Sequence, residues 1–147
     1  MRFGKILCLV LVVALVTGCG CFKKRSSDGD NIPVAQPGGP LADVNFGFDS
    51  YALNSSAKGT LEANAAWLRQ NADKSVQVEG HCDERGTNEY NMVLGMNRAR
   101  SAFDYLRSLG ISADRMSTVS YGEELPLDPR HNEEAWDKNR RAHSNVK

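Results

Sequence analysis

A carboxylate and a guanidinium lie fifteen positions apart in a densely charged stretch of the sequence, which runs from Glu79 to Arg100. Asp83 follows a strand-like run, and Arg98 lies in the helix-like segment that comes next. A guanidinium can bind a carboxylate through two parallel hydrogen bonds, and a carboxylate can accept hydrogen bonds from an ammonium group. The pair therefore predicts a site for a zwitterion, a ligand that carries both charges.

Two further residues share a helix strip with Arg98. Asn91, Leu94 and Arg98 are spaced i, i+3 and i+7, so they follow one side of a helix. Leu94 would give the site an apolar floor, and Asn91 would add a hydrogen-bond donor. The residues alone leave one alternative open, in which Asp83 and Arg98 form only an internal ion pair that contributes about 0–1 kcal/mol.

The sequence around Cys82 gives little indication of a catalytic site or a metal site. A nucleophilic cysteine needs a base within reach, and the sequence places no histidine to serve as one. His81, Cys82 and Asp83 are adjacent, so an extended chain cannot aim all three at one metal ion. Neither paired cysteines nor a His-Glu-x-x-His motif occurs. We expect no catalytic residue and no metal, and a Cys82-dependent thiol or metal enzyme is the weaker alternative.

Hydrophobic periodicity indicates the elements that must position these residues. Alternation predicts strands at VNFGF, with Val44, Phe46 and Phe48 on one face, and at SVQVEG and MSTVSYG. A helical stripe falls in each of the two segments between them. The stripe residues are Leu61, Ala65, Leu68 and Ala72 in the first helix, and Gly95, Ala99, Ala102, Phe103 and Leu106 in the second.

Capping residues predict where the helices begin and end. Ser55 or Ser56 can cap the first helix, Thr87 can cap the second, and Gly110 is a stop signal after it. NEEAWDKNR predicts a short third helix, and RAHSNV a last strand. This order, βαβαβ(α)β, predicts an α+β fold with helices on one face of a mixed four-stranded sheet.

The N-terminal residues have the features of a targeting segment. Basic residues precede an apolar run from Ile6 to Val16, which is shorter than the about 20 residues that a membrane span requires. The sequence Val-Thr-Gly-Cys that ends at Cys19 resembles the lipobox of bacterial lipoproteins. We therefore expect residues 1–18 to be a signal peptide, Cys19 to carry a covalent lipid and residues 19–43 to form a flexible tether.

The chain length, the net charge and the cysteines limit the number of domains and the kinds of binding partner. The 147 residues suffice for one domain, residues 44–147, and the formal net charge of zero gives no support for binding nucleic acid. Cys21 and Cys82 remain after the signal peptide is removed and the lipid attached, in an oxidising compartment. The role of Cys21, as a free thiol or as an intermolecular link, stays open.

Four segments carry a resemblance to a known family. They are VNFGFDS, VEGHCDERGTNEYNMVLGMNRA, SYGEELP and AWDKNRRA. Together they resemble the OmpA-like peptidoglycan-binding domain family, from about Val44 to Ala142, and they are most similar to its peptidoglycan-associated lipoproteins. The lipobox agrees with this resemblance independently.

The resemblance implies a non-catalytic protein that holds the peptide stem of peptidoglycan. In the family, the residues at the positions of Asp83 and Arg98 bind meso-diaminopimelate, a zwitterionic amino acid. Asn91 and Leu94 match positions that shape the pocket, and Phe48-Asp49 matches the segment at its rim. With this resemblance, the zwitterion site is favoured over the internal ion pair.

The chain departs from the family pattern in three places. Cys82 stands where Thr, Ser or Ala is usual, and Gly47 should loosen the first strand. The family ends in an apolar strand, whereas His143–Lys147 has no clearly apolar face. We expect this last strand to be frayed, short or differently paired.

The combined hypothesis is an outer-membrane lipoprotein whose domain faces the periplasm and tethers the membrane to the cell wall. By resemblance, TolB and other proteins of the Tol–Pal system are expected partners, with a role in envelope integrity and cell division. The alternative is a periplasmic protein-interaction module without wall binding.

Overall fold

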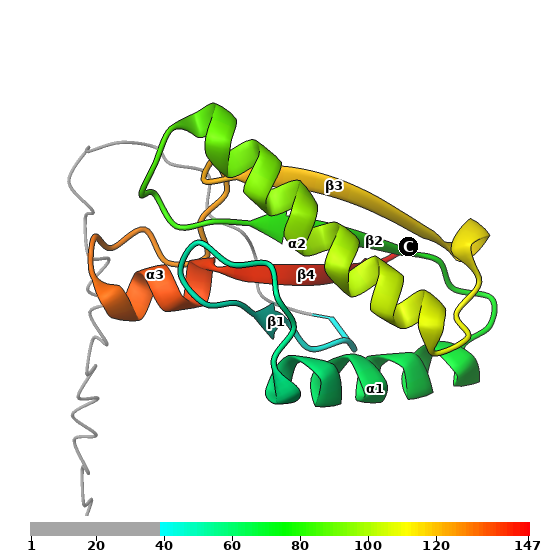
Figure 1. Cartoon of the computed structure of the whole chain (residues 1–147). Helices are drawn as coiled ribbons and strands as arrows, with labels where there is room; N and C mark the ends of the chain where they lie inside the picture. The colour runs from blue at the N-terminus through cyan, green and yellow to red at the C-terminus, as the bar shows by residue number, and fades with distance from the viewer. Residues whose placement is uncertain (1–38) are drawn as a thin grey trace, which may run out of the picture.

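The structure is a computed structural model and describes residues 39–147. Its elements follow the order that the sequence predicts (Figure 1). They are β1 (Val44–Asn45), α1 (Ser55–Gln70), β2 (Val76–His81), α2 (Asn88–Ser108), the short 3-10 helix η1 (Ala113–Arg115), β3 (Met116–Gly122), α3 (Glu133–Asn139) and β4 (Arg141–Val146).

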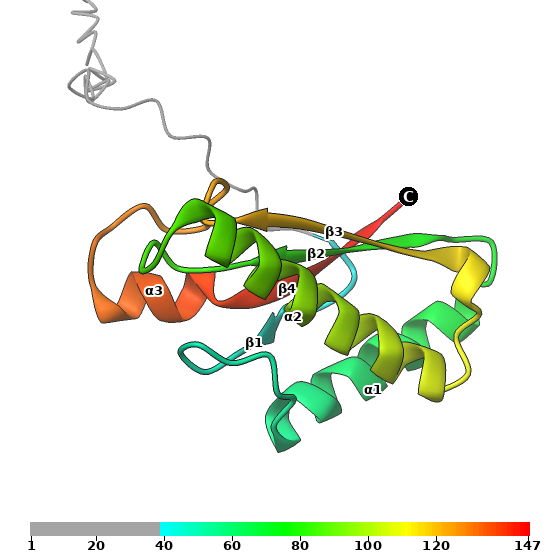
Figure 2. The same cartoon turned by 45° about the horizontal axis from the view of Figure 1, so that its top comes forward.

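The four strands form one mixed sheet in the order β1-β4-β2-β3. β2 and β3 are parallel, and α2 connects them, whereas β4 pairs antiparallel with both β1 and β2. α1 and α2 lie on the same face of the sheet, as Figure 2 shows, and α3 lies beside the end of the sheet at which β4 begins. The α+β class that the sequence predicts is confirmed.

The core fills the space between the sheet and the two long helices. Leu61 and Leu68 of α1 and Leu106 of α2 are completely buried, and they pack against Val76 and Val78 of β2. Each fully buried aliphatic side chain contributes about 1.5–3 kcal/mol of transfer free energy. The helical stripes that the sequence showed therefore form the core, with two exceptions: Phe103 is only partly buried, and Ala72 is exposed beyond the end of α1.

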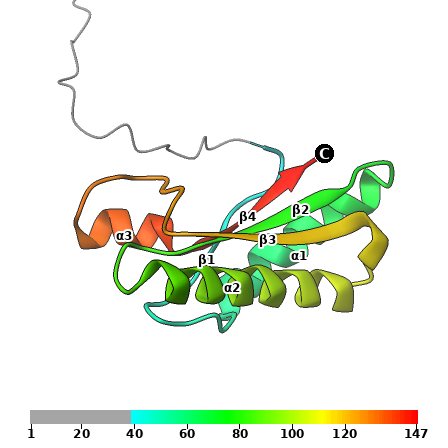
Figure 3. The ribbon, with the colours of Figure 1, turned by 90° about the horizontal axis from the view of Figure 1, so that it is seen from above.

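Two glycines let α2 approach β2 closely. A Cβ atom on Gly80 would lie 1.8 Å from the main-chain oxygen of Gly95, and one on Gly95 would lie 2.3 Å from the Oγ of Ser120. The backbones of the helix and the strand therefore pack directly against each other at these glycines, and Figure 3 shows α2 lying alongside β2 and β3. This contact brings the start of α2 next to the carboxyl end of β2, where Asp83 follows.

The helix ends agree with most of the capping signals. The Thr87 side chain accepts a hydrogen bond from the backbone N–H of Tyr90, and Gly110 has the positive φ of 91° expected after a helix. At α1 the cap is Asn54 rather than Ser55 or Ser56, and its side chain accepts from Ala57. The side-chain oxygen of Asn54, one residue before Ser55, thus accepts the hydrogen bond from a free backbone N–H of the first helical turn.

The first strand is shorter than the alternation predicted. Val44 and Phe46 are buried, but Phe48 is 61% exposed, so it does not share their face. The regular strand ends at Asn45, and the chain turns at Phe48 and Asp49, where Asp49 adopts a left-handed conformation with φ of 49°. Only Val44 and Asn45 are in β1, and one further bond runs from the Phe46 N–H to the Arg140 oxygen.

The last strand is neither short nor frayed, contrary to the expectation. β4 pairs along its length with β2, from Gly80↔Ala142 to Val76↔Val146. Ala142 and Ser144 are buried on one face, and His143 and Asn145 of the other face find partners on neighbouring segments. Asn145 donates to Glu79 over 2.9 Å, and His143 bonds to Asp43. Polar residues can therefore occupy a central strand here.

The chain is fixed to the domain just before β1. Leu41 is buried in the core, and Asn64 of α1 makes two hydrogen bonds to the backbone of Ala42, 3.0 Å from its N–H and 2.8 Å from its oxygen. Asp43 lies 2.6 Å from His143 and 3.3 Å from the Nε of Arg141. Packing thus begins at Leu41, three residues before the expected domain start.

Candidate functional site

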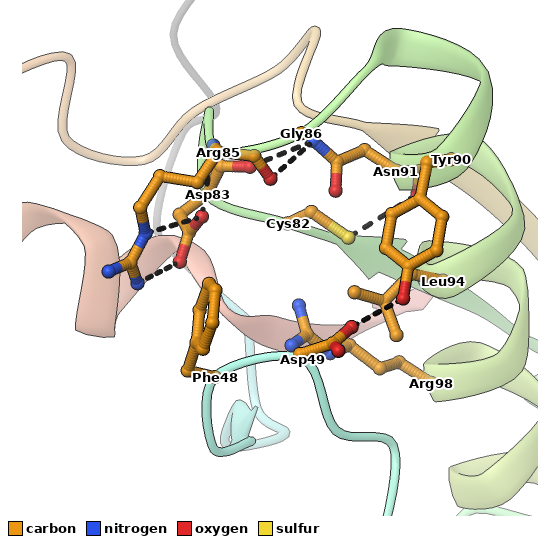
Figure 4. Close-up of a pocket in the computed structure, with 10 residues that line it drawn as sticks. All are labelled: Phe48, Asp49, Cys82, Asp83, Arg85, Gly86, Tyr90, Asn91, Leu94 and Arg98. Carbon is orange, nitrogen blue, oxygen red and sulfur yellow. Dashed lines mark hydrogen bonds and ion pairs between the residues drawn. The ribbon is translucent and has the colours of Figure 1, made fainter.

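A cleft of about 220 Å³ opens where the end of β2, the start of α2 and the loop after β1 meet (Figure 4). All six residues that the sequence singled out line the cleft: Phe48, Asp49, Asp83, Asn91, Leu94 and Arg98. Cys82, Arg85, Gly86 and Tyr90 complete its wall.

Arg98 lies at the inner end of the cleft and is 1% exposed. Its guanidinium donates only to main-chain oxygens, those of Ser50 at 2.8 Å, His81 at 2.8 Å and Gly47 at 3.0 Å. Burial lowers the pKa of Arg98, but a guanidinium remains protonated in proteins. Three carbonyls orient this cation without neutralising it, so it is suited to bind an anion.

Asp83 does not form an ion pair with Arg98. Its carboxylate instead lies 2.7 Å from Arg85 Nη2 and 3.2 Å from Arg140 Nη1. Burial raises the pKa of Asp83, but the hydrogen bonds from these two arginines outweigh it, and the net effect is a lowered pKa. Asp83 is therefore ionised at neutral pH, and the internal bridge that the sequence left open is absent from residues 39–147.

Arg85 and Arg140 are site residues that the sequence reasoning missed. Arg85 follows Asp83 by two positions, a spacing that allows the guanidinium to reach back to the carboxylate. Arg140 is 57 residues from Asp83 in sequence, and only the position of α3 and β4 brings it there. The Asp-x-Arg spacing was the one local signal that could have indicated Arg85.

Asn91 and Leu94 contribute from α2 as expected from their spacing. Leu94 is 8% exposed and lines the cleft with apolar surface. The Asn91 amide donates to the main-chain oxygens of Asp83 at 3.2 Å and Arg85 at 3.3 Å, and also to the carboxylate of Glu123. Asn91 thus holds the loop that carries Asp83 against the helix.

Phe48 and Asp49 form the rim on the opposite side. The Phe48 ring lies 4.1 Å from the guanidinium carbon of Arg85, a distance at which a cation and an aromatic face attract each other. Asp49 accepts a hydrogen bond from the hydroxyl of Tyr90, and this bond connects the loop after β1 to α2 across the cleft (Figure 4).

Cys82 lacks the features of a nucleophile. It is 3% exposed, and its sulfur donates to the main-chain oxygen of Asn91 at 3.3 Å. Burial raises the pKa of the Cys82 thiol to about 11, so the thiolate is scarce at neutral pH. Within residues 39–147, no cluster of three His, Cys, Asp or Glu side chains is arranged to hold a metal ion.

Several sequence expectations lie outside the described residues. They concern the signal peptide of residues 1–18, the lipid on Cys19, the role of Cys21 and most of the tether of residues 19–43. Among residues 39–147, no helix has both the length and the apolar character needed to cross a membrane.

Comparison with known proteins agrees with this architecture. A peptidoglycan-associated lipoprotein of Pasteurella multocida is 42% identical over 144 residues, which cover 96% of each chain. Another, from Mesorhizobium japonicum, is 35% identical over 91% of this chain and 88% of its own. The crystal structure of the peptidoglycan-associated lipoprotein from Burkholderia pseudomallei has a TM-score of 0.69 and 36% identity, covering 71% of this chain and 89% of that one.

A more distant structure shows the fold alone. The C-terminal domain of Helicobacter pylori MotB has a TM-score of 0.68 at 23% identity, covering 73% of this chain and 84% of that one. Residues 45–140 match the OmpA family, which is about two thirds of the chain. The chain therefore belongs to the OmpA family, and its relatives place it among the peptidoglycan-associated lipoproteins.

Proposed function

We propose that this protein binds peptidoglycan noncovalently, by holding the diaminopimelate residue of a stem peptide in the cleft between Asp83 and Arg98. The observation that carries the proposal is the guanidinium of Arg98, which is buried, oriented by three carbonyls and not neutralised by a carboxylate of the described residues. A buried cation without a counter-ion strongly favours an anionic ligand, because its charge is poorly screened by water.

The other end of the cleft supports a ligand that is also cationic. Asp83 is ionised, and it lies on the side of the cleft opposite Leu94 (Figure 4). Meso-diaminopimelate carries an ammonium and a carboxylate on the same carbon at its free end. Its carboxylate would bind Arg98, its ammonium would bind Asp83, and its methylene chain would lie on Leu94. The relatives named above are peptidoglycan-associated lipoproteins, which agrees with a ligand from the cell wall.

The proposal extends to the location of the protein. A lipid on Cys19 would hold the chain in the outer membrane, residues 19–43 would span the gap, and the domain would hold the wall from the periplasmic side. Connecting the membrane to the wall in this way is a mechanical role, which requires no catalysis. As a component of the Tol–Pal system, the protein would also bind TolB and other Tol proteins.

Co-sedimentation with purified peptidoglycan sacculi tests the proposal. The full chain in detergent is mixed with sacculi, and the bound fraction is compared with that of Arg98→Lys and Asp83→Asn. Each charge-assisted hydrogen bond contributes about 1.5–3 kcal/mol, so each variant should bind at least about tenfold more weakly. Arg100→Lys is the matched control for Arg98→Lys, because Arg100 is exposed on the same helix.

Thermal unfolding of each variant shows whether it remains folded at the temperature of the assay. Folded Arg98→Lys and Asp83→Asn proteins that bind sacculi as well as the wild type would overturn the proposed site. That result would favour the alternative, a protein-interaction module without wall binding.

A further inference from the structure

We infer that Arg85 competes with the ammonium group of the ligand for Asp83 and thereby lowers the affinity of the cleft for zwitterions. The inference rests on the proposed function and deepens it. An ionised carboxylate has about four positions at which it can accept hydrogen bonds. On Asp83, Oδ1 accepts from the backbone N–H of Arg85 at 3.1 Å and from its Nε at 3.2 Å. Oδ2 accepts from Arg85 Nη2 at 2.7 Å and from Arg140 Nη1 at 3.2 Å.

All four acceptor positions of Asp83 are therefore taken by arginine donors. An ammonium group can bind this carboxylate only if one guanidinium moves away. The two arginines differ sharply in their freedom to do so.

Arg140 is held in place from several sides. Its side chain is 6% exposed, and besides Asp83 it contacts Asp137 at 2.7 Å, Glu133 at 3.0 Å and the main-chain oxygen of Phe46 at 3.2 Å. Moving it would break these bonds within a buried setting, which is costly. Arg140 is therefore the permanent partner of Asp83.

Arg85 has a second set of partners that faces outward. Its side chain is 32% exposed, and its guanidinium carbon lies 4.4 Å from the centroid of the Trp136 ring and 4.1 Å from that of the Phe48 ring. Its Nη1 is 3.4 Å from the carboxylate of Glu133, which is largely exposed. When it leaves Asp83, the guanidinium can keep Glu133 and Trp136 as partners, so its displacement is the easier of the two.

This arrangement gives Arg85 a role in setting ligand affinity. A ligand with a carboxylate alone can bind Arg98, but it has nothing to offer Asp83 and leaves Arg85 in place. A ligand with both charges satisfies Arg98 and replaces the bonds that Asp83 gives up. Asp83 therefore provides the preference for an ammonium group, and the need to displace Arg85 offsets part of the binding free energy that this group contributes.

Two peptides probe the inference with the full chain in detergent. One is a stem tripeptide that ends in meso-diaminopimelate, and the other ends in 2-aminopimelate, which lacks the free ammonium. In the wild type, the first should bind at least tenfold more tightly by calorimetry. In Arg85→Gln, the diaminopimelate peptide should bind at least threefold more tightly than in the wild type, because its competitor is gone.

Arg130→Gln is the matched control. Arg130 donates to Asp128, two positions before it, with the same three donors that Arg85 uses: the backbone N–H at 3.2 Å, Nε at 3.0 Å and Nη2 at 2.7 Å. This pair does not line the cleft. The control loses an ion pair of equal geometry, and its affinity for the peptide should equal that of the wild type.

Trp136 provides a second readout. Movement of Arg85 changes the surroundings of its indole, so the diaminopimelate peptide should alter the fluorescence of the wild type. The change should be absent in Trp136→Phe, which retains only Trp67, and at least halved in Arg85→Gln.

The outcomes separate the inference from the proposed function. A wild-type chain that binds neither sacculi nor peptide overturns both. A wild type that binds the peptide, with an Arg85→Gln variant that binds equally or more weakly, overturns the inference alone, since Arg85 would then assist the ligand. Peptide binding without a change in Trp136 fluorescence also counts against displacement.

Discussion

Arg98 of α2 donates a hydrogen bond of 2.8 Å to the main-chain oxygen of His81, the last residue of β2. The pairing of β2 with β3 shifts register between Gly80 and His81, so this oxygen lies at an irregular strand end. The same guanidinium also binds the loop after β1 at Gly47 and Ser50. One side chain therefore fixes the relative positions of the three segments that form the cleft.

Arg98→Lys should lower the free energy of unfolding by about 2–4 kcal/mol. A lysine ammonium is a compact charge and cannot reach three carbonyls that match the planar guanidinium, so buried acceptors lose their donors. Urea denaturation followed by circular dichroism measures the change. Arg100→Lys on the exposed side of α2 should stay within about 0.5 kcal/mol of the wild type. A loss below 1 kcal/mol for Arg98→Lys would mean that the carbonyls find other donors.

Gly80→Ala should lower the free energy of unfolding by about 3 kcal/mol or more. The new methyl group would lie 1.8 Å from the Gly95 oxygen, so strand and helix must separate. Gly59→Ala is the matched control, because Gly59 lies in α1 with nothing within 4 Å of the added atom. It should raise stability by about 0.5–1 kcal/mol. Thermal and urea unfolding measure both variants, and equal effects would contradict the close contact.

His143→Gln should reduce stability more at pH 6 than at pH 9. The hydrogen bond to Asp43 raises the pKa of His143 above its ordinary value of 6.5. Because the pKa of His143 is higher in the folded protein than in the unfolded chain, protonation of His143 stabilises the folded protein. This stabilisation is complete at pH values below the pKa of the unfolded chain, and it is lost as the pH rises through the pKa of the folded protein. The loss at pH 6 should be about 0.5–1.5 kcal/mol.

The comparison with the wild type isolates His143 from its charged neighbours Asp43, Glu79 and Arg141. His81 also titrates, but burial lowers its pKa to about 3, and it is present in both proteins. A difference in stability that does not vary between pH 6 and pH 9 would exclude a protonated His143 as the partner of Asp43.

Asn64→Leu should lower the free energy of unfolding by about 1–3 kcal/mol. Both hydrogen bonds to Ala42 are lost, and the Ala42 backbone groups are left without these partners. Hydrogen exchange should accelerate most at the Ala42 amide, and urea denaturation gives the overall loss. Lys58→Leu, an exposed change on the same helix, should leave exchange at Ala42 unaltered.

Local signals in the sequence were sufficient for the helices and for the cleft residues on α2. The apolar stripe that includes Leu61 and Leu106, the cap at Thr87 and the glycine at 110 act over a few neighbouring residues, so they can be read directly. The strip of Asn91, Leu94 and Arg98 follows from helix geometry in the same way.

Features set by distant residues could not be predicted. Alternation placed Phe48 with Phe46, but the turn at Asp49 exposes it and puts it against Arg85. Arg140 reaches Asp83 only because β4 follows it into the middle of the sheet. The polar face of β4 is stable because partners such as Glu79 come from other strands, and no periodicity within the strand reveals them.

The position of β4 between β1 and β2 has a consequence for biosynthesis. Residues 141–146 leave the ribosome after every other element of residues 39–147, yet β1 has no other strand beside it, and β2 pairs with β4 along one edge. A nascent chain that stops before Arg141 cannot complete this sheet. The four-stranded sheet can therefore be completed only after synthesis has passed Val146.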